Sequence, residues 1–188
     1  MQFRRLFIIL IMTFAVLIEL PNLIKNELKR VCVGLASADW NSDENLFIPL
    51  HFLKALSDPE IWDIYDQLGE IQGAPFILKI QSIQYIPKGR HQGIISATLE
   101  DSKYLTTLKK NIATVLKPFE AVQSSDSQAI SIKLGTIHKE FPERLMQYLE
   151  AYGPYQSSPF DVAGFVLAKL HQTPKRSFYT VEKNYPFD

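Results

Sequence analysis

The chain contains a single cysteine, Cys32, among its 188 residues. One cysteine excludes an internal disulfide and any zinc site built from several thiolates. Cys32 lies between two valines, and this apolar setting is typical of a buried, unreactive thiol rather than of a nucleophile. The absence of disulfides is compatible with a reducing compartment, and we predict a cytoplasmic protein.

The sequence also lacks net charge, linkers and low-complexity segments. Twenty basic side chains balance twenty acidic ones, which argues against a broad surface that neutralises nucleic-acid phosphates. We therefore expect no DNA partner, although a local basic groove is compatible with this composition. No Pro- or Gly-rich stretch divides the chain, and its length suits one domain or two closely packed lobes.

One apolar run stands out, at residues 6–18, directly after two arginines. Such a run resembles a signal-peptide core or a short membrane anchor. Glu19 and Pro21 interrupt it, it is shorter than the ~20 residues of a membrane-spanning helix, and no small-residue cleavage site follows. We favour a buried strand at 14–19 over a targeting segment, and we do not expect a membrane partner.

Hydrophobic periodicity predicts an α+β fold with mostly antiparallel pairing. Some segments have apolar residues at helical spacing, and others have the alternating pattern of strands. Their order along the chain is β-α-β-α-β-β-α-β-α-β-β. The expected helices are 21–35, 57 to about 69–73, 101–117 and 143–152, and the expected strands are 14–19, 45–53, 76–86, 93–99, 129–137, 160–170 and 178–185. Residues 1–13 are an apolar extension, and residues 1–11 precede an alternative start at Met12.

Several segments of the chain form a pattern that is informative only in combination. They are 14–21 with 24–28, 40–53, 75–80, 102–108, and 160–167 with 178–181. Their order and spacing resemble the 2H phosphoesterases, which include RNA 2′,5′-ligase-like proteins and 2′,3′-cyclic phosphodiesterases. The resemblance covers nearly the whole chain from residue 14. It implies a single bilobal, pseudo-twofold domain over 14–188, with mostly antiparallel sheets, flanking helices and a central groove.

The resemblance also implies one His-x-Thr or His-x-Ser motif on a strand of each lobe, facing the shared groove. In that family one histidine acts as base, the other as acid, the hydroxyls hold the phosphate, and no metal or other cofactor is required. Here the first motif falls on Phe47-Ile48-Pro49. The second falls on Ser131-Ile132-Lys133 or, two residues earlier, on Ala129-Ile130-Ser131. Neither motif contains a histidine, so the family's catalytic pair is missing.

Strand alternation predicts which side chains face the groove. In the first motif strand, Ile48 and its neighbours at 46, 50 and 52 form the core face, so Phe47, Pro49 and His51 share the other. In the second, Ser131 and Lys133 face out. We expect ligand binding to involve Phe47, His51, Ser131 and Lys133, because an imidazole, an ammonium and a hydroxyl together can hold an anion.

Three interpretations follow from these residues. The first is a catalytically inactive 2H-like protein whose groove binds a nucleotide, an RNA end or another phosphate-bearing ligand. The second is an active phosphodiesterase with a rearranged site that uses His51 and Lys133. The third is an interaction scaffold without a small-molecule ligand. The remaining histidines lack metal-ligand spacing, and we expect no metal, no cofactor and a monomeric protein.

Overall fold

A computed structural model describes residues 13–188 except for short gaps at 54–55, 90–91, 120–121, 124–129 and 175. The helices are α1 Asn22–Lys29, α2 Asp58–Gly69, α3 Lys103–Leu116 and α4 Pro142–Tyr152, and a short 3₁₀ turn, η1, spans Asp43–Asn45. The strands are β1 Thr13–Glu19, β2 Ala38–Trp40, β3 Phe47–Leu53, β4 Phe76–Leu78, β5 Ile80–Gly89, β6 Gln92–Leu99, β7 Val122–Gln123, β8 Ser131–Ile137, β9 Phe160–Val162, β10 Gly164–Gln172 and β11 Ser177–Pro186.

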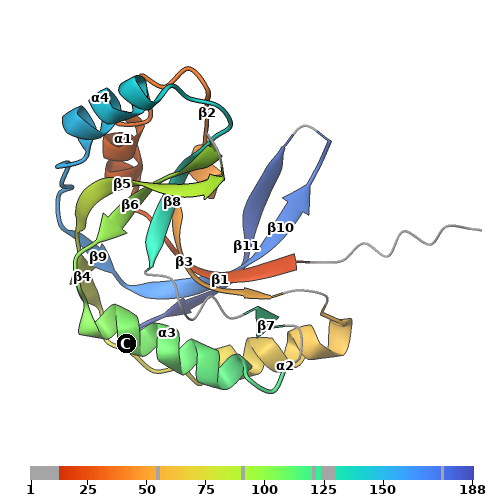
Figure 1. Cartoon of the computed structure of the whole chain (residues 1–188). Coiled ribbons are helices and arrows are strands. Elements are labelled where there is room, and N and C mark those ends of the chain that lie inside the picture. Colours follow the sequence, from red (N-terminus) through yellow and green to blue (C-terminus); the bar gives the residue numbers. More distant parts are fainter. Residues whose placement is uncertain (1–12, 54–55, 90–91, 120–121, 124–129, 175) are drawn as a thin grey trace, which may run out of the picture.

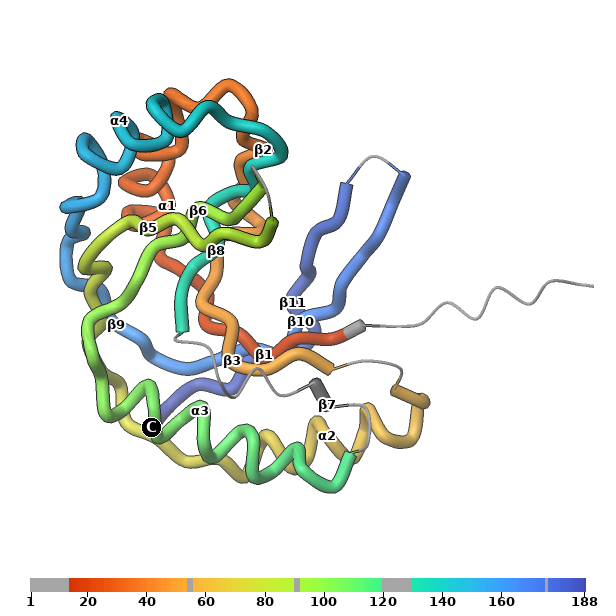
Figure 2. Tube along the Cα trace, in the orientation of Figure 1, coloured from red at the N-terminus to blue at the C-terminus, as the bar shows by residue number. Residues whose placement is uncertain are grey.

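Most strands form two larger antiparallel sheets, one in each of two lobes (Figures 1 and 2). The first lobe has the sheet order β11-β10-β1-β3-β7, with α2 and α3 along one face. The second lobe has the order β2-β8-β6-β5, with α1 and α4 along one face. A small β4-β9 ladder lies where the chain passes between the lobes. The fold is therefore α+β and bilobal, as the sequence predicted.

Local signals in the sequence start two of the helices. The backbone N–H of Ser57 donates to the Glu60 carboxylate at 2.7 Å, which forms half of a capping box at the start of α2. The Ser102 hydroxyl accepts from the backbone N–H of Leu105 at 3.2 Å and caps α3. Each of these helices then buries one apolar stripe against the first sheet.

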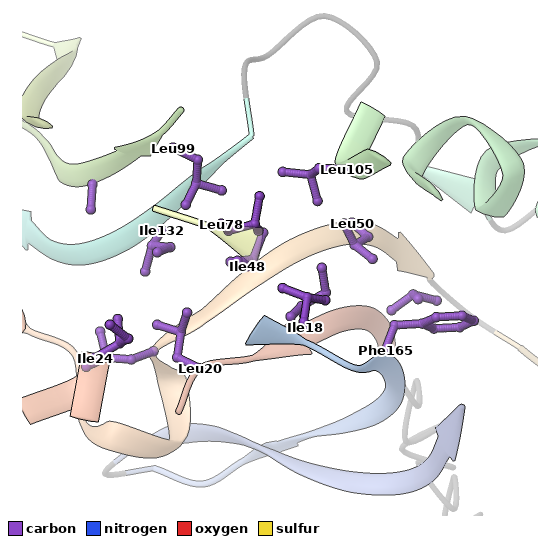
Figure 3. Packing of buried hydrophobic residues seen from close by; sticks show 14 of the residues in the cluster. Ile18, Leu20, Ile24, Ile48, Leu50, Leu78, Leu99, Leu105, Ile132 and Phe165 are labelled. Atoms are coloured by element: carbon purple, nitrogen blue, oxygen red, sulfur yellow. The ribbon is translucent and has the colours of Figure 1, made fainter. Parts of the chain in front are cut away.

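The main core lies between the helices and the sheets and includes β1, β3 and α3 (Figure 3). Ile18, Ile48 and Leu50 are at most 2% exposed and pack on this side. Alternate residues of β1, Ala15 and Leu17, turn to the opposite face of the first sheet, where they form a smaller apolar cluster. This second face carries no helix (Figure 1), so it is available to build a site.

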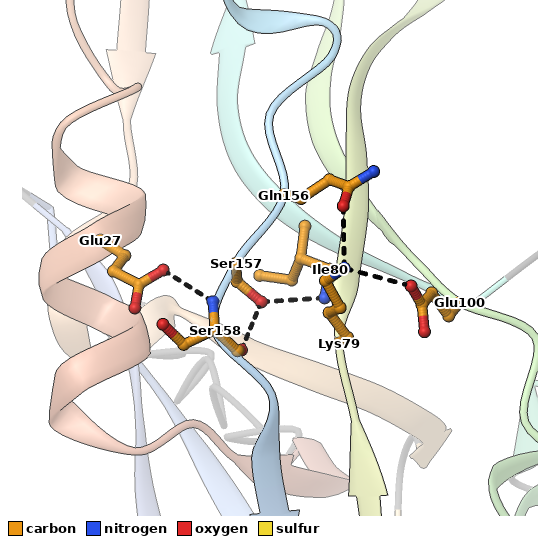
Figure 4. Close-up of polar contacts among 7 residues, drawn as sticks. All are labelled: Glu27, Lys79, Ile80, Glu100, Gln156, Ser157 and Ser158. Carbon is orange, nitrogen blue, oxygen red and sulfur yellow. Dashed lines mark hydrogen bonds and ion pairs between the residues drawn. The ribbon is translucent and has the colours of Figure 1, made fainter.

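Two neighbouring segments, 76–80 and 153–162, are fixed to each other by buried polar contacts (Figure 4). The Ser157 hydroxyl, in a residue only 4% exposed, accepts from the backbone N–H of Ile80 at 3.0 Å and donates to the carbonyl of Ser158 at 2.8 Å. The Glu27 carboxylate of α1 accepts from the Tyr155 hydroxyl at 3.0 Å and from the Ser158 N–H at 3.1 Å. These contacts attach α1 to the connection that enters β9.

The ionisation of Glu27 contributes to this attachment. Burial alone raises the pKa of Glu27, but hydrogen bonds from Ser158 and Tyr155, together with the nearby Arg30 charge, outweigh it and hold the pKa below its usual range. A carboxylate whose pKa is lowered on folding stabilises the folded state above its unfolded-state pKa, ~4.3, and this contribution is lost as the pH falls through the lower folded-state value.

We therefore expect Glu27→Gln to lower the free energy of unfolding by about 1 kcal/mol near neutral pH. Urea unfolding measured in steps from pH 7 into the acid range should show the difference from wild type shrinking as Glu27 becomes protonated. Glu150→Gln is the matched control, because Glu150 is exposed on α4 and its loss should change stability by less than ~0.5 kcal/mol. A deficit that stays constant into the acid range would contradict the assignment.

The N-terminal segment and Cys32 can be compared with what the sequence predicts. The strand expected at 14–19 is β1, which lies between β10 and β3, whereas residues 1–12 of the apolar extension lie outside the described residues. Among the described helices, none is long and apolar enough to span a membrane. Cys32 is half-buried, and burial raises its pKa to about 11, as expected of an unreactive thiol.

Three expected elements differ in extent. The strand expected at 76–86 is divided into β4 and β5. The helix expected at 21–35 ends at Lys29, and the chain then passes through Gly34, whose φ of 84° favours glycine. The strand expected at 160–170 is divided into β9 and β10. At the division, a side chain on Gly164 would collide with the Tyr185 carbonyl oxygen, so a glycine is needed there.

Candidate functional site

The two strands expected to carry the motifs, β3 and β8, lie close together where the sheets of the two lobes meet (Figure 1). Both strands contain a bulge at the same place relative to the expected motif. The pairing of β3 with β1 skips Leu50, which follows Pro49. The pairing of β8 with β6 skips Leu134, which follows Lys133. The bulges therefore make Pro49 and Lys133 equivalent positions of a pseudo-twofold arrangement, and likewise Phe47 and Ser131.

A hollow of about 360 Å³ lies between the lobes beside these positions. Its described lining comes from the loop before β3, from β3 and β8, and from the β10-β11 hairpin. The lining residues are Asn41, Asn45, Phe47, Pro49, Phe52, Lys133, Leu170, Ser177 and Tyr179. Three of the four motif positions, Phe47, Pro49 and Lys133, thus face one common space.

The loop at the mouth of the hollow is held by amide side chains. Asn41 donates through its Nδ2 to the carbonyl of Lys133 at 2.7 Å, which ties the loop before β3 to β8. Asn45 donates to the carbonyl of Ser177 at 2.8 Å, which ties η1 to β11. These two hydrogen bonds connect the loop before β3 to the second lobe and to the β10-β11 hairpin beside the hollow.

The first lobe contributes an aromatic wall. The rings of Phe47 and Tyr179 meet edge to face, with centroids 5.1 Å apart. Both rings, with Phe52, pack on the apolar cluster of the helix-free face. Burial raises the pKa of Tyr179, so its hydroxyl is neutral at physiological pH and can donate or accept a hydrogen bond.

The second lobe contributes a polar wall. Its described helix-free face has two rows of polar side chains across β8, β6 and β5. In one row Ser131 pairs with Thr98, whose hydroxyl lies 2.6 Å from the Ser82 hydroxyl. In the next row Lys133 pairs with Ser96, whose hydroxyl accepts from Gln84 at 3.3 Å. The exposed Lys133 side chain therefore stands at the end of a polar row.

Comparison with solved structures identifies this architecture. TT0787 of Thermus thermophilus gives a TM-score of 0.77 at 18% identity, covering 94% of this chain and 98% of that chain. A phosphoesterase structure gives 0.78 at 16% identity, with the same coverage of both chains, and apo LigT of E. coli gives 0.76 at 15%. The chain has the 2H phosphoesterase fold. No protein-family model and no curated protein matches the sequence.

The likeness at these identities establishes the 2H fold and leaves the chemistry to the residues of the groove. LigT of E. coli has been solved with 3′-AMP, with phosphate, with ATP and with NADP⁺. In the present chain the positions of the expected motifs hold a phenyl ring, a pyrrolidine ring, a hydroxyl and an ammonium group. The described residues contain no group of three or more His, Cys, Asp or Glu side chains placed to hold a metal ion.

The predicted placement of His51 on the groove face is wrong. His51 is 1% exposed and is absent from the described lining of the hollow. The bulge at Leu50 adds one residue to β3, so the strict alternation fails after Pro49. For the same reason Phe52, expected in the core, faces the groove instead. The pair of His51 and Lys133, on which a rearranged active site depended, is not brought together in the hollow.

Ser131, which was also expected to face the groove, lies on the polar wall but not in the hollow. It begins β8, is partly buried, and pairs with Thr98 on the polar wall, but it is not among the described residues that line the 360 Å³ hollow. The alternative register would place the first motif position at Ala129, which lies outside the described residues. The equivalent bulges favour the register Ser131-Ile132-Lys133, because they place Lys133 opposite Pro49 in the pseudo-twofold arrangement.

The other described histidines lie away from the hollow's lining. His138 is exposed, and its Nε2 lies 2.9 Å from the Asp39 carboxylate at the edge of the second sheet. His171 of β10 stacks on Phe178 and bonds to the Thr180 hydroxyl at 2.7 Å. His91 lies outside the described residues. No described histidine therefore replaces the missing catalytic pair in this hollow.

Sequence reasoning missed six residues of the described lining, and Phe52, which was expected in the core, is one of them. Leu170 and Tyr179 come from the β10-β11 hairpin, whose strands were predicted at 160–170 and 178–185 but were not placed near β3. Its position depends on the pairing of β10 with β1, and local alternation contains no information on that pairing. Asn41 precedes the η1 turn, Asn45 ends it, and Ser177 starts β11. Their only sequence signal is that polar residues precede a strand that faces the groove.

Proposed function

We propose that the protein is a catalytically inactive 2H-fold protein that holds a nucleotide, an RNA end or another phosphate-bearing ligand in its central groove. One observation carries the proposal. The exposed Lys133 side chain and the aromatic pair of Phe47 and Tyr179 line one hollow of about 360 Å³. A cation beside aromatic surface suits a phosphate attached to a base, and LigT, which has the same fold, has been solved with 3′-AMP.

The lack of catalysis follows from the chemistry of the motif positions. Displacement at a phosphodiester needs one group to remove a proton from the attacking oxygen and another to protonate the leaving oxygen, each worth ~10²–10⁴ in rate. Phe47 and Pro49 can do neither, and Ser131 has no described histidine beside it. The alternative of catalysis by His51 loses its geometric basis because His51 lies in the core.

The scaffold interpretation receives less support than ligand binding. A groove filled by Phe47 beside a large exposed apolar patch would favour that interpretation. Phe47 instead leans on Tyr179 and leaves a hollow of about 360 Å³ at its side. This volume lies within the ~300–1,000 Å³ that is usual for small-ligand pockets.

The test measures binding and turnover on the same samples. We expect 3′-AMP and 2′,3′-cyclic AMP to bind in isothermal titration, and 2′,3′-cyclic AMP to be recovered unchanged after incubation. Lys133→Met should weaken binding about tenfold, because it removes a charge-assisted contact. Lys117→Met, at an exposed lysine after α3, is the matched control and should leave affinity unchanged. Absence of binding, or equal binding by the Lys133 variant, would refute the proposal.

A further inference from the structure

The two walls of the groove differ sharply in polarity. The first-lobe wall consists of Phe47, Pro49, Phe52, Leu170 and Tyr179. Beneath it lie small and branched apolar side chains of β1 and β10, namely Ala15, Leu17, Val166 and Ala168. These four are at most 5% exposed, so the apolar surface is continuous from the hollow into the sheet.

Charge is also unevenly distributed around the hollow. Lys133 is exposed and stands on the polar wall. Arg176, at the base of the hairpin turn, is already paired with the Glu44 carboxylate at 3.0 Å and lies over the Phe178 ring at 4.6 Å. Among the described lining residues there is one cationic side chain and no carboxylate. The described lining of the hollow therefore offers one positive charge, on one side only.

The size of the hollow limits what the two walls can hold together. A volume of about 360 Å³ is near the lower end of the range for small-ligand pockets, ~300–1,000 Å³. It suits one ring system with a single attached group better than a run of nucleotides. The pseudo-twofold strands place the apolar and the cationic positions opposite each other, because Pro49 and Lys133 are equivalent.

We propose that the groove selects amphiphilic anions, which are ligands with a flat apolar ring body and one terminal anionic group. The ring lies on the wall formed by Phe47, Leu170 and Tyr179, and the anion meets Lys133 at the end of its polar row. This inference rests on the proposed function and narrows its ligand class. A phosphate monoester and a carboxylate both supply the anionic group. The ring adds binding affinity that a bare anion lacks, because it buries apolar surface.

The experiment compares four probes by isothermal titration: inorganic phosphate, 1-naphthyl phosphate, 1-naphthoate and neutral 1-naphthol. We expect 1-naphthyl phosphate to bind at least about tenfold tighter than inorganic phosphate, because the ring buries apolar surface. It should also bind at least about tenfold tighter than 1-naphthol, because naphthol cannot pair with Lys133. Tight binding of 1-naphthoate as well would support the inference while removing the phosphate requirement from the proposed function.

Variants of the apolar wall test where the ring lies. Leu170→Asn should weaken the binding of 1-naphthyl phosphate about fivefold or more. Its affinity for inorganic phosphate should stay within about twofold of the wild-type value. Leu23→Asn, on an α1 side chain that is 63% exposed, is the matched control. Circular dichroism checks the fold, and Leu170→Thr replaces Leu170→Asn if the latter does not fold, because threonine is compatible with a strand.

The outcomes separate the inference from the proposed function. Phosphate and 1-naphthyl phosphate binding equally, both dependent on Lys133, would overturn the inference and leave the proposed function intact. Naphthol binding as tightly as naphthyl phosphate would overturn the requirement for an anion. If Leu170→Asn weakened the binding of inorganic phosphate and of 1-naphthyl phosphate equally, the assignment of the ring to the apolar wall would be overturned. Binding of none of the probes, together with no binding of 3′-AMP, would overturn both proposals.

Discussion

Hydrolysis of 2′,3′-cyclic AMP is expected to appear when the two motifs are restored by Phe47→His, Pro49→Thr, Ser131→His and Lys133→Thr. The bulges at Leu50 and Leu134 are properties of the backbone pairing and should hold the new side chains toward one shared space. An acid and a base placed there contribute ~10²–10⁴ in rate each. Chromatographic detection of the ring-opened product, with wild type assayed in parallel, measures the gain.

The controls for the restored chain are its two halves. The variant with only Phe47→His and Pro49→Thr, and the variant with only Ser131→His and Lys133→Thr, should each stay close to the wild-type background, because one proton transfer is missing in each. A folded four-site variant without turnover would mean that β3 and β8 do not present these positions as the fold requires. Wild-type turnover equal to that of the four-site variant would mean that catalysis uses other residues.

The part of the site that sequence reasoning placed correctly lies before the bulges. Phe47 and Pro49 face the hollow because simple alternation holds from the start of β3 up to Pro49. Lys133 faces it for the same reason in β8. Pro49 itself indicates an irregularity in the strand, since proline cannot donate a hydrogen bond to a sheet ladder and is typical of edges and bulges. The bulge follows directly after it.

The side chains of β3 that were placed incorrectly lie after its bulge. One extra residue reverses which side chains face the core. His51 therefore faces the core instead of the groove, and Phe52 faces the groove instead of the core. A proline indicates that an irregularity is near, but it does not say on which side of it the extra residue falls. That detail depends on the pairing with β1, which is a long-range contact, and the placement of Leu170 and Tyr179 depends on long-range pairing in the same way.

The fold was more predictable than the site because it rests on many weak signals that agree. Segments at 14–21, 40–53 and 160–167 each fit several folds, yet their order fits the 2H fold, and the comparison with solved structures confirms it. The site depends on single residues, and each single position is sensitive to a one-residue shift in register. Agreement among segments compensates for local errors in the fold, whereas His51 had no second signal to correct it.

The largest loss of stability is expected from Leu50→Ala. Leu50 is the extra residue of the β3 bulge, is 1% exposed, and packs in the main core (Figure 3). Removing its outer carbon atoms leaves a cavity among neighbours that are held by the sheet, which costs about 2–5 kcal/mol. Urea unfolding and thermal melting measure this loss, and each kcal/mol should lower the melting temperature by about 2–4 °C in a chain of this length.

Leu23→Ala is the matched control, because it makes the same substitution on an α1 side chain that is 63% exposed. Its effect should stay within about 0.5 kcal/mol, since an exposed leucine leaves no cavity and alanine favours the helix. A small effect of Leu50→Ala would mean that the bulge does not direct Leu50 into the core. Because Phe47 and Pro49 alternate with Ile48 and Leu50 along β3, that result would remove the basis for placing both residues in the groove.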